Sequence, residues 1–197
     1  MTFGASDVLD LYNLVRAWRK ANADRFPMPS FDDSVRFAFT EAGELVDAVL
    51  RMNPKYSRNH DTVRDIFREA ADLVFMLLTA YLYIEEAENV ENDFSKYVED
   101  VVDSWVMREK YSEENIKKLS GIFEHFVIVD LIAAQMGKAY GQFVAWGRYP
   151  AQKSLFVVYS LPILWLVSYL WHGDDEDTLY SEVRDRLLRI ENRLNHG

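Results

Sequence analysis

Apolar residues recur every three or four positions along most of the chain, rather than in the strict alternation that is typical of a half-buried strand. Only 8 glycines and 5 prolines interrupt this pattern in 197 residues. The sequence therefore predicts an all-α fold, a helical bundle. The predicted helices cover residues 8–23, 31–52, 62–86, 93–111, 122–146, 152–171 and 178–194, with one further short helix after Ser112.

Two short motifs indicate where helices begin. Ser30 is followed three residues later by Asp33, and Thr62 stands in the same relation to Asp65. The Ser or Thr side chain accepts a backbone N–H of the first turn, while the acidic side chain reaches back to the cap residue. Both motifs precede long amphipathic segments, so each predicts a helix N-terminus.

The composition allows a large core and excludes several function classes. Apolar residues make up 49% of the chain and aromatic residues 14%, which favours one globular unit or two intimately packed halves. The 32 acidic residues outnumber 22 basic ones, and the net charge of −10 argues against nucleic acid as a partner. The absence of cysteine excludes a disulfide, a thiolate metal site and a cysteine nucleophile. The first residues show no secretory signal, so a cytoplasmic location is expected.

Four carboxylates stand in two pairs on consecutive predicted helices. Glu41 and Glu44 form the first pair, and Glu69 and Asp72 form the second. Residues three apart share a face of a helix, so each pair can reach one point. Antiparallel packing of the two helices would bring all four acids together. The alternative is that both pairs lie on solvated helix faces, where such spacings also occur by chance.

The surroundings of Asp72 favour a buried site. It is the only charged residue between Ala70 and Ile84. Burying an unpaired charge costs several kcal/mol, so Asp72 needs a proton, a basic partner or a cation. The same helix offers few basic partners, because Arg68 points about 100° away from the neighbouring Glu69 and Arg64 lies about a turn further back.

A divalent cation is the simplest way to relieve repulsion among four clustered acids. Mg²⁺, with Mn²⁺ as an alternative, prefers oxygen ligands of this kind. No histidine or cysteine joins the motif, which disfavours zinc and the Glu-x-x-His pattern of di-iron bundles. The sequence therefore predicts a magnesium site formed by Glu41, Glu44, Glu69 and Asp72.

These acid pairs resemble the ExxE…ExxD signature of the all-α nucleoside triphosphate pyrophosphatase superfamily, which includes MazG-like proteins and dimeric dUTPases. The resemblance covers about residues 8–110. It implies that the four acids hold Mg²⁺, which binds the triphosphate of a nucleotide and activates a water to attack the α-phosphorus. The implied products are a nucleoside monophosphate and pyrophosphate, with dUTP or dCTP among the expected substrates.

The first motif departs from the family pattern at one position. Many members carry a Glu-Glu pair at its start, whereas Thr40 precedes Glu41 here. If the missing glutamate helps to activate water, Glu41 or Glu44 must take that catalytic role. The departure also supports an alternative function, a non-catalytic helical interaction or nucleotide-sensing protein that retains a metal site.

The second half, residues 112–197, resembles a degenerate copy of a MazG-like catalytic half, residues 1–111. When the halves are aligned, Gln135 and Lys138 take the positions of the first acid pair, and residues 131–173 contain no acid at all. We expect an internal pseudo-dimer with a single site, in which Lys138 contacts substrate phosphates. A plain surface lysine is the alternative.

Further substrate contacts are predicted from position along the chain. Two basic segments place cations near the expected triphosphate: the loop between the two acidic helices, and the end of the fourth predicted helix. An aromatic face can stack on a nucleobase. For each residue, a solvated or core position is the alternative. The candidates are Lys55, Arg58, Arg108, Lys110 and Trp18, with Phe37 as the alternative aromatic face.

The uncharged segment 155–171 would form a helix nearly long enough to span a membrane. It contains Pro162 and several polar residues, and it takes the place of a buried helix. We therefore expect this segment in the core and expect no membrane partner. The high aromatic content could also support a homo-oligomer.

Overall fold

The structure, a computed structural model, is all-α. It describes residues 5–52, 55, 62–87, 98, 100, 114, 124–146, 150–171 and 178–196, and these residues include no strand. The helices are α1 (Ala5–Ala21), α2 (Phe31–Arg51), α3 (Val63–Ala87), α7 (Glu124–Trp146), α8 (Pro150–Ser168), the 3-10 helix η1 (Tyr169–Trp171) and α9 (Leu179–His196). The fold class is thereby confirmed, and each of these helices agrees with its prediction to within a few residues. The helices predicted over 93–111 and after Ser112 lie almost wholly outside the described residues.

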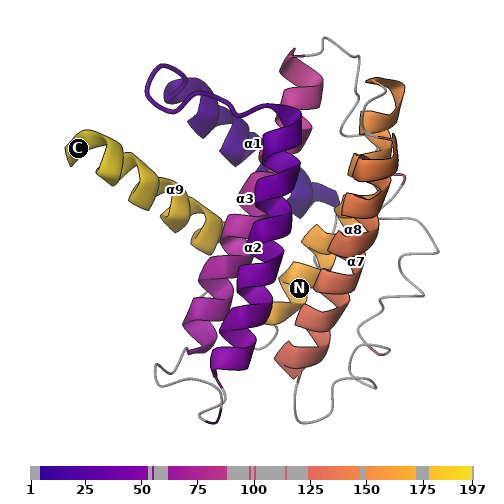
Figure 1. The fold of residues 1–197 in the computed structure, drawn as a ribbon. Coiled ribbons are helices and arrows are strands. Elements are labelled where there is room, and N and C mark those ends of the chain that lie inside the picture. The colour runs from indigo at the N-terminus through magenta and orange to yellow at the C-terminus, as the bar shows by residue number, and fades with distance from the viewer. Residues whose placement is uncertain are drawn as a thin grey trace.

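The helices form two hairpins that pack on each other (Figure 1). α2 and α3 make the most extensive helix pair, and α7 and α8 make the second hairpin. The hairpins meet where α2 packs on α7 and α3 packs on α8. α1 and α9 each pack on α3 and contact each other. This pairing is compatible with an internal pseudo-dimer, although the repeat and the boundaries 1–111 and 112–197 stay predictions.

Aromatic side chains join the two hairpins in the core. Phe31, the first residue of α2, makes edge-to-face contacts with Phe143 of α7 and Phe156 of α8, at ring-centroid distances of 5.9 and 5.6 Å. Tyr81 of α3 shares a 2.7 Å hydrogen bond with Ser160 of α8. All five side chains are buried. Each such ring pair adds about 1 kcal/mol to the stabilisation from buried area, so these contacts hold the hairpins together.

The uncharged segment 155–171 is largely buried, as predicted. It forms most of α8 and all of η1, and its core residues include Phe156, Leu161 and Leu164. None of the helices that the structure describes combines the length and apolar character needed to cross a membrane.

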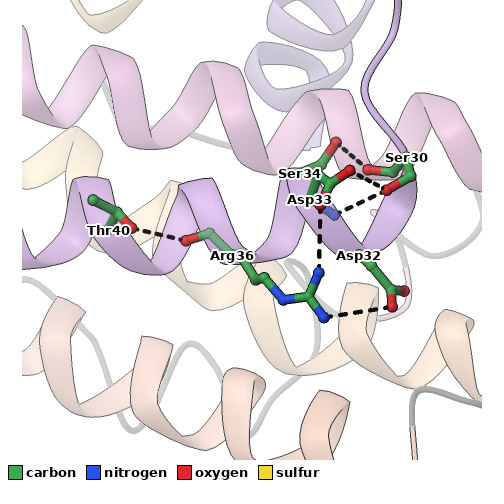
Figure 2. A network of polar contacts seen from close by, with 6 residues as sticks. All are labelled: Ser30, Asp32, Asp33, Ser34, Arg36 and Thr40. Atoms are coloured by element: carbon green, nitrogen blue, oxygen red, sulfur yellow. Dashed lines mark hydrogen bonds and ion pairs between the residues drawn. The ribbon is translucent and has the colours of Figure 1, made fainter.

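The Ser30 side chain caps α2 as predicted, and at the start of α3 the predicted bond from the acid back to Thr62 is present. At α2, the Ser30 hydroxyl accepts the Asp33 backbone N–H at 3.1 Å and donates to the Asp33 carboxylate at 2.7 Å (Figure 2). At α3, the Asp65 carboxylate accepts the backbone N–H and the hydroxyl of Thr62, each at 2.8 Å. These bonds satisfy polar groups that a helix end leaves unpaired, and they fix where α2 and α3 begin.

Replacing the cap of α2 tests this local stabilisation. We expect Ser30→Ala to lower the free energy of unfolding by about 1 kcal/mol, because the Asp33 N–H loses its acceptor. Thr40→Ala is the matched control on the same helix, since the Thr40 hydroxyl donates to the Arg36 carbonyl at 3.1 Å and caps no helix end (Figure 2). Its effect should stay under about 0.5 kcal/mol. Urea denaturation measures both, and equal losses would contradict the capping role.

Candidate metal centre

Three of the four predicted acids converge where α2 packs on α3. Glu41 of α2 and Glu69 and Asp72 of α3 each place a carboxylate oxygen within 4.8 Å of the other two. Their spacing puts Glu69 and Asp72 on one face of α3, and the hairpin brings that face to Glu41. Glu44 is exposed and stands outside the group, although its charge acts on all three. Glu41, Glu69 and Asp72 are termed the acidic centre below.

Burial and mutual repulsion oppose full ionisation of the acidic centre. Asp72 is only 8% exposed, and Glu41 and Glu69 are partly buried. Burial, followed by the charges of Asp72, Glu44 and Glu69, raises the pKa of Glu41 to about 7. Burial and the charge of Asp72 also raise the pKa of Glu69, and burial raises the pKa of Asp72. At neutral pH the centre therefore favours a bound proton or a cation.

An arginine from the last helix faces this centre. Arg186 of α9 forms an ion pair with the Asp72 carboxylate, and its charge also acts on Glu41. Arg189, which pairs with Glu182 at 3.1 Å, adds to the positive field at Asp72. Arg186 lies on α9 and not on the helix of Asp72, so the residues around Asp72 in the sequence do not reveal it.

The pattern of α9 holds the signal that could have revealed Arg186. Arg186, Ile190, Arg193 and Leu194 recur at helical spacing, and all four line one pocket in the structure. An inward face that mixes apolar and basic residues requires an acidic partner on a neighbouring helix, because a buried charge needs a counter-ion.

The donor set fits a small divalent cation. Carboxylate oxygens are preferred ligands of Mg²⁺ and Mn²⁺. Two opposite ligands at about 2.1 Å from Mg²⁺ lie about 4 Å apart, close to the 4.8 Å that encloses the three oxygens. Three ionised carboxylates and one arginine leave two negative charges, which a divalent cation balances. Glu41, Glu69 and Asp72 would hold the ion, and Glu44 lies one helical turn from Glu41.

A pocket of about 410 Å³ lies beside the acidic centre, between α1, α2, α3 and α9. Glu41, Asp72 and Arg186 line it. Its other lining residues are apolar, aromatic or basic: Arg19, Phe26, Pro27, Pro29, Phe37, Phe75, Met76, Ile190, Arg193 and Leu194. Such a pocket suits a ligand that joins an apolar ring to charged groups.

The remaining predicted contact residues fall into three groups. Trp18 is buried and packs edge-to-face on Phe26 and Phe75, at ring-centroid distances of 5.3 and 5.8 Å. It supports the pocket wall without lining it, which is the core position given above as its alternative. Lys55 and Lys138 are exposed and do not line the pocket. The described residues do not include Arg58, Arg108 and Lys110.

The second hairpin carries a polar contact where the first carries an acid. Gln135 of α7, which aligns with Glu41, is buried and donates its amide to the Tyr159 carbonyl of α8 at 2.7 Å. In the part of the chain that the structure describes, the acidic centre is the one group of three close metal-ligating side chains. The two aligned positions therefore differ in charge, while the repeat itself stays a prediction.

Comparison with known proteins adds no assignment to this site. No family model matches the chain, and no curated protein or solved structure matches it either. The resemblance to the all-α nucleoside triphosphate pyrophosphatases therefore stays a prediction, carried by the four acids.

The raised pKa of Glu41 predicts an unusual pH dependence of stability without metal. A carboxyl whose pKa is about 7 when folded, against 4.5 ordinarily, binds its proton more tightly in the folded state. Its contribution is therefore fully present below about pH 4.5 and is lost as the pH rises through 7. We expect the free energy of unfolding to fall by roughly 1–2 kcal/mol between pH 5 and 8, since solvent screens part of the shift. Urea denaturation in the presence of a chelator measures the free energy of unfolding at each pH. In Glu41→Gln this free energy should depend less on pH. A wild-type stability that rises between pH 5 and 8 would contradict the prediction.

Proposed function

We propose that the protein is a Mg²⁺-dependent nucleoside triphosphate pyrophosphohydrolase, which cleaves an NTP or dNTP to the monophosphate and pyrophosphate. The observation that carries this proposal is the acidic centre, whose three carboxylate oxygens lie within 4.8 Å of one another beside a pocket of about 410 Å³. A divalent cation at these carboxylates would attract a polyphosphate, and the pocket has room for the rest of a nucleotide. Following the resemblance, dUTP and dCTP are the first substrates to test.

Each part of the site has a role in this reaction. When bound, Mg²⁺ offsets the charge of the triphosphate and lowers the pKa of a water molecule. The acidic centre holds the ion. Glu44, the acid outside the centre, accepts a proton from the attacking water. It thereby takes the role of the glutamate that many family members carry at the position of Thr40. Arg186 and Arg193 line the pocket and provide donors for phosphate oxygens.

One observation favours a second candidate function. The ion pair between Arg186 and Asp72 already neutralises the most buried acid of the centre without a metal. This favours the non-catalytic helical interaction or nucleotide-sensing protein, which retains a metal site but does not turn over a nucleotide. The two candidates differ in whether the acids are needed for turnover or only for stability.

A product analysis tests the proposed reaction. The purified chain is incubated with Mg²⁺ and each common NTP and dNTP, and the products are separated by ion-exchange chromatography. We expect monophosphate and pyrophosphate from at least one nucleotide. Diphosphate and inorganic phosphate would indicate cleavage at the other anhydride bond and refute the proposal. No turnover in Mg²⁺ or Mn²⁺ would favour the non-catalytic candidate.

A further inference from the structure

Arg19 is a buried cation in the wall of the pocket. It does not form an ion pair with the acids of the acidic centre. It belongs to α1 and is only 4% exposed, yet it lines the pocket. Its Nη2 donates to the Thr79 hydroxyl at 3.0 Å. Among the residues that the structure describes, no acceptor lies within hydrogen-bond reach of its Nε and Nη1. Burial lowers the pKa of Arg19 to about 10, so it stays charged at neutral pH. Buried donors of this kind require an acceptor.

Aromatic rings hold the Arg19 side chain in place. Its guanidinium carbon lies 4.8 Å from the ring centroid of Phe26 and 4.7 Å from that of Phe75. Both rings also line the pocket, together with Phe37 from α2. Cation–π contacts at this distance fix the guanidinium, so its donors are presented from a rigid position. The pocket thus combines flat apolar walls with fixed donors.

The chemistry of these walls defines the ligand group that fits them. An arginine has five N–H donors and no acceptor, so its partner must carry an acceptor oxygen or nitrogen. Flat apolar walls suit a planar ring and disfavour a second free charge. Under the proposed function the phosphates bind at Arg186 and the acidic centre, of which Glu41 and Asp72 line the same pocket.

We infer that this pocket holds a nucleobase with a carbonyl oxygen at C4 of a pyrimidine or C6 of a purine, and that Arg19 donates a hydrogen bond to that oxygen. The inference rests on the proposed function, because the nucleotide's phosphates are assigned to the acidic centre. It names the substrate class within that function: uracil, thymine, hypoxanthine and guanine carry a carbonyl where cytosine and adenine carry an amino group. An amino group at that position would present donors to the Arg19 donors, so this hydrogen bond would be lost.

The test compares nucleotides that differ at this one group. Inosine and adenosine 5′-monophosphates form one pair, and uridine and cytidine 5′-monophosphates form the other. Monophosphates have no anhydride bond, so binding is measured without turnover, by calorimetry in Mg²⁺. We take the pair, purine or pyrimidine, that has the higher affinity for the protein. Within it, the nucleotide with the carbonyl group should bind at least roughly tenfold more tightly than the nucleotide with the amino group.

Arg19→Met should reduce this preference to less than about twofold, because the variant keeps an apolar side chain of similar length without donors. The Thr79 hydroxyl still donates to the Phe75 carbonyl at 2.8 Å, so this substitution leaves that hydroxyl bonded. Arg16→Met is the matched control on the same helix: Arg16 is half exposed, pairs with Glu85 at 3.7 Å and does not line the pocket. The control should keep the wild-type preference. Arg19→Lys, which retains the charge and donors, serves if Arg19→Met fails to fold, and should give an intermediate preference.

Several outcomes would overturn the inference. They are a failure of all four monophosphates to bind, equal affinities within both pairs, and a preference that survives in Arg19→Met. Failure of this inference can be distinguished from failure of the proposed function. Turnover of every base at the same rate would leave the reaction standing and remove the role of Arg19. An Arg19-dependent preference without any turnover would leave the binding pocket standing and remove the reaction.

Discussion

Glu69→Gln is expected to abolish Mg²⁺-dependent hydrolysis, with kcat/KM lowered by at least about 10³-fold. The substitution keeps the shape of the side chain but removes one of three anionic oxygens that lie within 4.8 Å of one another. A metal ion contributes several kcal/mol of transition-state stabilisation, and each 1.36 kcal/mol corresponds to a factor of ten. The measurement is pyrophosphate release at saturating and limiting nucleotide in Mg²⁺.

Asp47→Asn is the matched control for this substitution. Asp47 lies on α2 like Glu41, but it is exposed and pairs with Arg51 at 3.2 Å, outside the acidic centre. Its activity should stay within about twofold of the wild type. Glu69→Gln should melt at or above the wild-type temperature without metal, because it removes one charge from a repelling cluster. Full activity in Glu69→Gln would place the reaction elsewhere and refute the proposed site.

The sequence predicts the helices well because their signals are local. The starts of α2 and α3 are specified by Ser30 with Asp33 and by Thr62 with Asp65, each within one helical turn. The burial of Asp72 follows in the same way from the uncharged stretch around it. These features depend on neighbours in sequence and need no knowledge of tertiary packing.

The cations of the site could not be predicted in the same way. Arg186 meets Asp72 only because α9 packs on α3, and Arg19 enters the pocket only because α1 does so too. Arg19 stands next to Trp18, a candidate base contact for which a core position was the alternative. In the structure Trp18 lies in the core and Arg19 lines the pocket. Which residue of such a neighbouring pair faces a cavity depends on how three helices cross.

Arg186→Met is expected to destabilise the metal-free protein by roughly 2–3 kcal/mol at pH 8. Arg186 forms an ion pair with the Asp72 carboxylate, and their side chains are 22% and 12% exposed. Removing one partner leaves a buried charge uncompensated, at a cost that partial exposure reduces. Arg184→Met on the same helix is the control, because Arg184 is exposed and pairs only loosely, at 3.7 Å, with its neighbour Asp185. Urea denaturation with a chelator measures both variants, and equal stabilities would contradict a role for the ion pair.

Adding Mg²⁺ to Arg186→Met and to the wild type tests whether the acidic centre binds the ion. If the acidic centre binds the ion, Mg²⁺ should restore most of the stability lost in Arg186→Met, because a cation then replaces the missing guanidinium at Asp72. The gain should be smaller in the wild type, where Arg186 already offsets part of the charge. Lowering the pH to 5 should also reduce the cost of the substitution, since burial raises the pKa of Asp72 and favours its protonation. If low pH stabilises Arg186→Met but Mg²⁺ does not, the acidic centre binds protons and not a metal ion. The ion pair between Arg186 and Asp72 would then be purely structural.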